Sequence, residues 1–107
     1  MLTTTIALGV WMTYLKCKWK HDNPDHPILL YSELDEERWE TRKVEIFRNG
    51  KLGFADRDTE FGGSGLGLEP VPPLTAIAAD PEFEPEAITK AEFELVWSAA
   101  VESASTK

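Results

Sequence analysis

The strongest constraint on the fold is an amphipathic helix near the end of the chain, because one apolar stripe must be buried against another layer. Thr89 and Glu92 have the spacing of a capping box, in which hydroxyl and carboxylate satisfy exposed N–H groups at a helix start. Ile88 before the cap and an apolar residue in the first turn fit a hydrophobic staple. The stripe that follows has helical spacing. It consists of Phe93, Val96, Trp97, Ala100 and Val101.

Strand patterns earlier in the chain predict the second layer. Tyr14 to Lys20 alternates between apolar residues and lysines, which is the period of a half-buried strand. Ile28 to Leu34 and Trp39 to Arg48 are short runs typical of strands, and they are separated by turn formers. We expect the C-terminal helix to lie across this sheet.

Asn49-Gly50 predicts a hairpin with a two-residue type I′ turn, since both turn positions would need positive φ. Such a turn would place Val44 and Ile46 opposite the small residues Ala55 and Gly53, on the face that the helix covers. Phe47, Leu52 and Phe54 would then lie on the other face. The N-terminal strand would curl over that face, or it would be an interaction surface.

The chain after this hairpin has weaker signals. Phe61 to Leu68 is glycine-rich, and it lacks the Gly-Lys-Ser/Thr and the following helix of a phosphate-binding loop. Leu74 to Ala79 predicts a short extra helix with Pro73 near its first turn. Glu82 to Ile88 is interpreted as an acidic, extended stretch.

These elements predict an α+β fold. We expect a four-stranded antiparallel meander, five-stranded if the N-terminus adds a strand, packed against the C-terminal helix. One domain spans 13–101, and the tail 102–107 is expected to fray. Residues 1–12 form an extension that is either a non-native start or an extra strand. They are too few to span a bilayer and have no basic signal-peptide region, so no membrane association is expected.

The formal net charge of −8 is concentrated in the second half of the chain. Residues 13–57 carry nine basic and nine acidic side chains, whereas residues 58–107 carry ten acidic side chains and two lysines. Nucleic-acid binding needs a basic field, so no nucleic-acid partner is expected. The single cysteine, Cys17, excludes an internal disulfide and favours a reducing compartment, the cytoplasm.

The acidic lead-in to the helix is the most function-like feature. Its members are Asp80, Glu82, Glu84 and Glu86. They could attract a basic partner protein, or they could serve solubility alone. Trp39 is added to this candidate interface because exposed tryptophan is typical of binding hot spots. The lysines at 16, 18 and 20 could bind phosphate, or they could pair across strands with Glu33 or Glu45.

The segment 21–27 gives an alternative site. Imidazole and carboxylate groups could act there as acid and base or share a metal. The candidate residues are His21, Asp22, Asp25, His26 and Arg42. The prolines fix the backbone and turn formation alone explains the composition, so no metal, cofactor or catalytic residue is assigned.

Residues 13–56, 69–85 and 88–97 together resemble a family of small bacterial proteins classed as a domain of unknown function. The resemblance spans about Met12 to Trp97. It implies a compact domain that starts near Met12, and it carries no activity, cofactor or catalytic residue. Similar small acidic bacterial domains often act as immunity or antitoxin proteins, which is an analogy.

Three functions are therefore open. The first is a non-enzymatic protein-binding module, of the immunity or antitoxin type, that uses the acidic surface. The second is a small enzyme or ligand-binding domain that uses the 21–26 loop. The third is a structural or regulatory subunit that associates through an open sheet edge, and the chain would then be a homodimer rather than a monomer.

Overall fold

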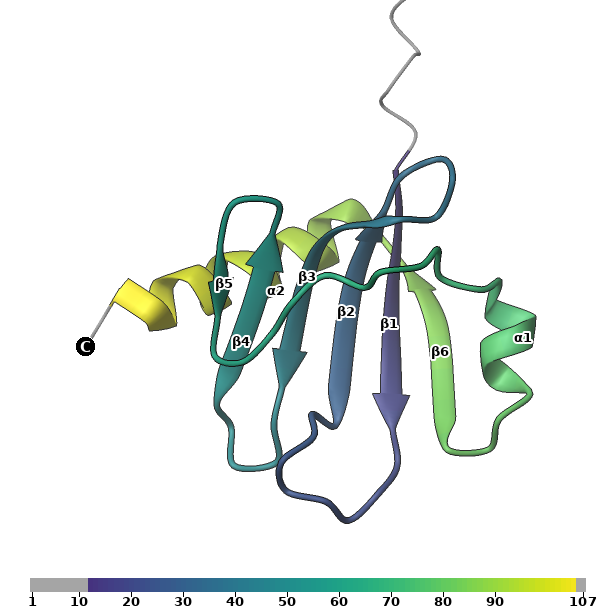
Figure 1. The fold of residues 1–107 in the computed structure, drawn as a ribbon, viewed down its shortest axis with the longest axis horizontal. Helices are drawn as coiled ribbons and strands as arrows, with labels where there is room; N and C mark the ends of the chain where they lie inside the picture. Colours follow the sequence, from purple (N-terminus) through teal and green to yellow (C-terminus); the bar gives the residue numbers. More distant parts are fainter. Residues whose placement is uncertain (1–11, 106–107) are drawn as a thin grey trace, which may run out of the picture.

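A computed structural model describes residues 12–105, which form a six-stranded antiparallel sheet and two helices (Figure 1). The strands are β1 (Thr13–Trp19), β2 (Leu29–Leu34), β3 (Glu40–Ile46), β4 (Leu52–Asp56), β5 (Glu60–Phe61) and β6 (Phe83–Ile88). The helices are α1 (Leu74–Ala78) and α2 (Lys90–Ser105). The order across the sheet is β5-β4-β3-β2-β1-β6. The predicted α+β fold, its meander and its two helices are confirmed, and the sheet has two more strands than the four expected.

The acidic, extended stretch before α2 is a strand. β6 pairs antiparallel with β1, so that Lys18 lies opposite Glu84 and Cys17 lies opposite Pro85. The backbone N–H of Lys20 donates to the carbonyl of Glu82 at 2.8 Å. Along an antiparallel strand, the residues that bond to one neighbouring strand alternate with residues whose backbone groups point away from it. Pro85 is at a position that points away from β1, so its lack of an N–H costs no hydrogen bond to β1. A proline is tolerated there because β6 is an edge strand.

The β3–β4 hairpin forms at the expected place with a different register. Gly50 has a φ of 88°, whereas Asn49 does not have a positive φ, so the turn is not type I′. The Phe47 N–H donates to the Lys51 carbonyl and closes a three-residue loop, 48–50. Ile46 therefore pairs with Leu52. A one-residue slip moves the side chains of β4 to the other face, so the predicted facing of β4 was wrong. Val44 and Ile46 of β3 lie on the helix side of the sheet, as expected.

α2 covers one face of the sheet, here called the helix face. Val44 and Phe54 lie on that face and pack against Ala100. The Trp97 ring meets the Phe54 ring edge-on, with 5.3 Å between centroids, and the Phe93 side chain is completely buried. Leu52 and Phe54, which were expected on the opposite face, thus contribute to the core under the helix.

The start of α2 is the capping box read from the sequence. The Thr89 N–H donates to Glu92 Oε1 at 2.9 Å, and the Glu92 N–H donates to Thr89 Oγ1 at 3.1 Å. The helix continues to Ser105, so residues 102–105 are helical rather than frayed. The predicted N-terminal extension lies outside the described residues except for Met12, as do residues 106–107.

The opposite face of the sheet, here called the loop face, is covered by chain 62–73 and α1. Figure 1 shows this connection crossing the sheet on the side away from α2. Beneath it lies a small core that contains the buried residues Leu15, Cys17 and Leu34. Leu74 and Ile77 of α1 pack against these residues. The domain is therefore three layers thick, with regular helix on one side and mostly irregular chain on the other.

Candidate functional site

The predicted acidic surface lies on strand β6 and on the turn before it, next to the lysine stripe of β1. Lys18 lies opposite Glu84 and Lys16 lies opposite Glu86 in the sheet register. The Lys20 Nζ donates to Glu84 Oε2 at 2.8 Å, and Lys18 Nζ lies 3.9 Å from Glu84 Oε1. The hydrogen bond from Lys20 lowers the pKa of the Glu84 carboxyl. Lys18 and Lys20 thus pair with Glu84 of the edge strand β6 rather than with Glu33 or Glu45, whereas Lys16 lies over the ring of Tyr31 in β2.

The other acids of this run are exposed but held by local contacts. Asp80 Oδ1 accepts a hydrogen bond from the Glu82 N–H at 2.9 Å, which fixes the turn into β6. Glu82 Oε1 accepts a hydrogen bond from Trp19 Nε1 at 3.2 Å. All four acids, Asp80, Glu82, Glu84 and Glu86, are exposed. The strand therefore presents carboxylates from a backbone that β1 holds in place.

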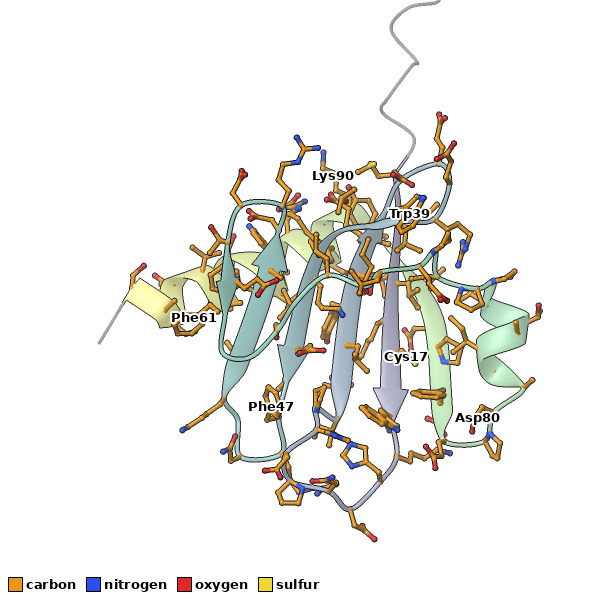
Figure 2. The ribbon with its side chains drawn as sticks, in the orientation of Figure 1. Cys17, Trp39, Phe47, Phe61, Asp80 and Lys90 are labelled. Atoms are coloured by element: carbon orange, nitrogen blue, oxygen red, sulfur yellow. The ribbon has the colours of Figure 1, made fainter. Side chains whose placement is uncertain are left out.

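Trp39 lies at the other end of the sheet from Asp80 (Figure 2). Its side chain is exposed, and its N–H donates to Asp35 Oδ1 at 3.0 Å. The preceding residue, Arg38, has a φ of 70° and donates from Nε to the carbonyl of Val71 at 2.7 Å. Trp39 therefore lies next to the residue through which the β2–β3 turn binds the proline-rich connection. The structure does not bring Trp39 together with the acidic run.

The histidines of the alternative site are both close to Trp19. His21 Nδ1 accepts a hydrogen bond from the Asn23 N–H at 3.0 Å, and His21 Nε2 lies 2.8 Å from the Pro27 carbonyl. An accepting Nδ1 requires the proton on Nε2, which then donates to that carbonyl. Both ring nitrogens are thereby used inside the loop. The His26 ring stacks on Trp19 at 5.1 Å and is exposed.

The remaining members of the alternative site are dispersed. Asp22 and Asp25 are exposed loop residues at the foot of the sheet. Arg42 lies at the opposite end of β3, on the helix face, where it contacts neither histidine. Within residues 12–105, no group of three or more His, Cys, Asp or Glu side chains is arranged to hold a metal ion. Nor does that part of the chain contain a helix that is long and apolar enough to cross a membrane.

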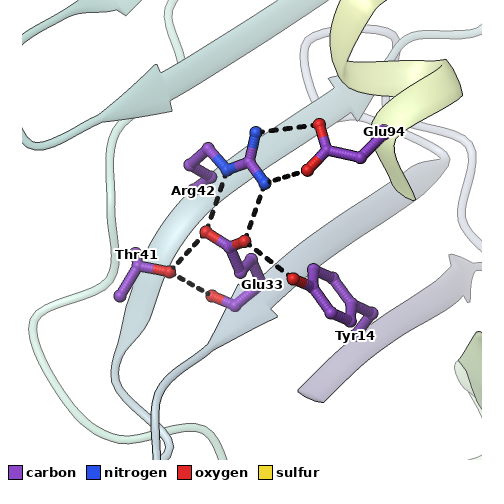
Figure 3. A network of polar contacts seen from close by, with 5 residues as sticks. All are labelled: Tyr14, Glu33, Thr41, Arg42 and Glu94. Atoms are coloured by element: carbon purple, nitrogen blue, oxygen red, sulfur yellow. Dashed lines mark hydrogen bonds and ion pairs between the residues drawn. The ribbon is translucent and has the colours of Figure 1, made fainter. Parts of the chain in front are cut away.

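Arg42 instead forms the centre of a polar network between sheet and helix (Figure 3). Its guanidinium donates two hydrogen bonds to Glu33 of β2, at 2.7 and 2.9 Å. It donates two more to Glu94 of α2, at 2.6 and 3.1 Å. Its Cζ atom lies 4.9 Å from the Phe93 ring centroid and 5.0 Å from that of Trp97. This residue therefore joins the helix to the sheet by charge and by stacking.

The groups of this network shift one another's pKa values. Burial by itself raises the pKa of the Glu33 carboxyl, but hydrogen bonds from Arg42 and Thr41 outweigh burial and leave that pKa below its usual range. The hydrogen bonds to Glu33 raise the pKa of Arg42. Burial, followed by the hydrogen bond to Glu33, raises the pKa of Tyr14. The charged groups of this network are hydrogen-bonded to one another, and these bonds hold α2 against the sheet.

Sequence reasoning missed a second polar cluster, which lies on the loop face under the glycine-rich segment. Glu40 Oε1 lies 3.1 Å from Lys43 Nζ and accepts a hydrogen bond from the Gly67 N–H at 2.7 Å. Glu45 Oε1 accepts a hydrogen bond from Ser64 Oγ at 2.6 Å. The alternation of charged and apolar residues in β3 was a signal for a polar face. It did not indicate that a glycine-rich segment would cover that face.

The chain matches one family model, described as "Domain of unknown function (DUF6881)", over residues 13–102. No curated protein and no solved structure matches the chain. Because the matched region covers most of the chain, the chain belongs to this family.

Proposed function

We propose that this domain is a non-enzymatic protein-binding module that docks a basic partner protein on the acidic surface of β6. The observation that carries the proposal is the exposure of four carboxylates at one sheet edge, with Glu84 and Glu86 on β6 and Asp80 and Glu82 in the turn that leads into it. A rigid backbone lowers the cost of binding, because little conformational freedom is lost on association. Opposite charge on the partner would speed encounter and select against acidic competitors.

The edges of the sheet favour side-chain recognition over strand addition. Pro85 lies in the middle of β6 and has no N–H to donate on the outer side of that strand. The strand at the other edge, β5, is only two residues long. Such edges resist pairing with another chain. Association as a homodimer through an open edge is therefore a weaker candidate than capture of a partner by carboxylates. An immunity or antitoxin protein would use this surface to bind a basic effector in the cytoplasm and to block its active surface. The buried thiol of Cys17 is compatible with that compartment.

The proposal is tested by affinity capture from extracts of the native host, using three forms of the purified chain. These are the wild type, the reversal Glu82→Lys/Glu84→Lys/Glu86→Lys, and the matched control Glu36→Lys/Glu37→Lys in the exposed β2–β3 turn. We expect a basic protein that binds the wild type and the control but not the β6 reversal. Retention of that protein by the β6 reversal would contradict the electrostatic mechanism.

A further inference from the structure

The outer side of α2, which faces away from the sheet, is uncharged between residues 91 and 99. The residues on this side have helical spacing, and all of them are exposed. They are Ala91, Leu95, Ser98 and Ala99. Leu95 is 75% exposed, although leucine is a large apolar residue. A surface helix normally has one apolar side and one polar or charged side, so a second uncharged side indicates a second contact.

A hollow of about 340 Å³ lies directly beside Leu95, on the helix face of the sheet. Its apolar lining comes from Tyr31 of β2, Ile88 of β6 and Val96 of α2, and these three residues are half-buried. Leu95 itself lines the same hollow. A projecting apolar side chain therefore lies next to a recess of the kind that could receive one.

The rim of this hollow carries both signs of charge. Lys16 of β1 and Glu86 of β6 both line it, and they lie opposite one another in the sheet register. The Lys16 Nζ atom instead lies 5.9 Å from the centroid of the Tyr31 ring. Within residues 12–105, neither Lys16 nor Glu86 forms an ion pair. An unpaired cation and an unpaired carboxylate thus flank one apolar recess.

This combination is self-complementary. A twofold axis brings the same patch of two identical chains together, so each group must find its partner within that patch. Rotation by 180° allows Leu95 of each copy to enter the hollow of the other copy. The same rotation allows Lys16 of each copy to meet Glu86 of the other. A partner of a single charge sign would leave one of these two groups facing a like charge.

We propose that the outer side of α2 and the adjoining hollow form the interface of a symmetric homodimer, here called the α2 interface. Its apolar centre is Leu95 in the hollow of the other copy, and its rim is Lys16 against Glu86. The α2 interface uses side chains, so it differs from association through the backbone of an open sheet edge. It does not rest on the proposed docking of a basic partner, with which it shares only Glu86.

The size of the α2 interface suits a weak dimer. The 16 residues of α2 are about 24 Å long. The helix and the hollow over two neighbouring strands are together roughly 20 Å wide. The contact is then roughly 500 Å² per copy and about 1,000 Å² in total, which is near the lower limit of specific interfaces. The net charge of −8 on each copy opposes association, but salt at about 0.15 M limits this repulsion to roughly 8 Å.

The first test is sedimentation velocity of the full chain at about 0.15 M salt, from roughly 10 μM to 1 mM protein. We expect the wild type to shift from monomer to dimer over this range. Leu95→Glu should weaken the dimer at least about tenfold, because it places a carboxylate in an apolar recess. The matched control is Leu68→Glu on the loop-face connection, where the leucine is 90% exposed. This control should dimerise like the wild type.

The second test uses the reciprocity of the rim contacts. Lys16→Glu and Glu86→Lys should each weaken self-association, since like charges then meet at both rim contacts of the dimer. An equimolar mixture of the two variants should form a heterodimer, because every lysine again meets a glutamate. Such recovery requires that residue 16 of one copy lies near residue 86 of the other. The single variants and their mixture are compared by sedimentation under the same conditions.

Four outcomes would overturn the proposal. The first is a wild type that stays monomeric at roughly 1 mM, a concentration that populates even weak complexes. The second is a Leu95→Glu variant that dimerises as well as the wild type. The third is equal weakening by Leu68→Glu, which would indicate unspecific apolar association. The fourth is a mixture of the two charge variants that associates no better than either variant alone. Leu95 is exposed, so its replacement should leave the fold intact, and thermal melting checks this.

Discussion

Replacing Arg42 by alanine should destabilise the domain, because it removes the cation that joins Glu33 of the sheet to Glu94 of α2. The substitution leaves the Glu33 carboxylate with hydrogen bonds from Tyr14 and Thr41 but without a cation. Removal of one partner of a buried ion pair costs about 3–5 kcal/mol. The Arg42 side chain is 20% exposed and the Glu33 side chain 9%, so we expect the lower end, about 3 kcal/mol. Glu94→Gln should cost about 1 kcal/mol or less, because Glu94 is 39% exposed.

The assay is urea unfolding followed by tryptophan fluorescence. A loss of 3 kcal/mol lowers the unfolding midpoint by roughly 1–3 M urea for the slopes usual in small domains. The effect should depend on pH. The pKa of Glu33 is lower in the folded state than in the unfolded state, where it is near 4.5. The charged carboxylate therefore stabilises the wild type at pH values above 4.5, and this contribution is lost as the pH falls through the folded pKa. In the variant, burial disfavours the charged Glu33, and this penalty disappears in acid.

The difference in unfolding free energy between wild type and Arg42→Ala should therefore shrink from pH 7 to pH values below 4.5. Adding Glu33→Gln to the variant should restore part of its stability, because the uncompensated charge is removed. An equal difference at both pH values would refute the electrostatic reasoning and attribute the loss to packing on Phe93 and Trp97. A double variant less stable than Arg42→Ala would refute it in the same way.

Three further predictions concern single positions. Thr89→Ala should cost about 1 kcal/mol, seen as a drop of roughly 4–8 °C in the melting temperature, because the capping box loses its acceptor at the Glu92 N–H. Gly62→Ala should destabilise more than Gly63→Ala in the same thermal assay. Both have positive φ, but a Cβ at Gly62 would lie 2.9 Å from Gly53 Cα, whereas one at Gly63 meets nothing within 4 Å. Cys17 should react with a thiol reagent at pH 8 at least about tenfold more slowly in the native state than in urea, since burial raises its pKa. Similar rates in both states would show that the thiol is accessible.

Local patterns predicted the parts of the fold that depend on local chemistry. The capping box at Thr89 fixed the start of α2 to the residue, since its two hydrogen bonds lie within one turn. The Asn49-Gly50 turn located the hairpin but not its register. Asn tolerates either sign of φ, and here Gly50 alone takes the positive value. The segment of β6 was interpreted only as an extended stretch. Pro85 interrupts its strand pattern, and the place of β6 at the edge of the sheet makes that proline acceptable.

The candidate sites were less predictable because they depend on which strands become neighbours. Arg42 and Glu33 lie on the same face only through the β2–β3 register, and Glu94 reaches them only after α2 has docked. A single sequence contains no such pairing information. The lysine stripe of β1 was correctly read as one side of a strand, but its acidic partners come from β6.

The pairing of the last strand with the first also determines when the sheet can be completed. Lys20 and Glu84 bond across a separation of 64 positions, so β1 keeps one open edge until the C-terminal quarter of the chain has been made. Contacts so distant in sequence slow folding. During synthesis, the apolar side of β1 and its unpaired backbone would be exposed to other chains. Truncation before Phe83 should therefore yield a product that aggregates, and the lysines of β1 would be its main protection until β6 arrives.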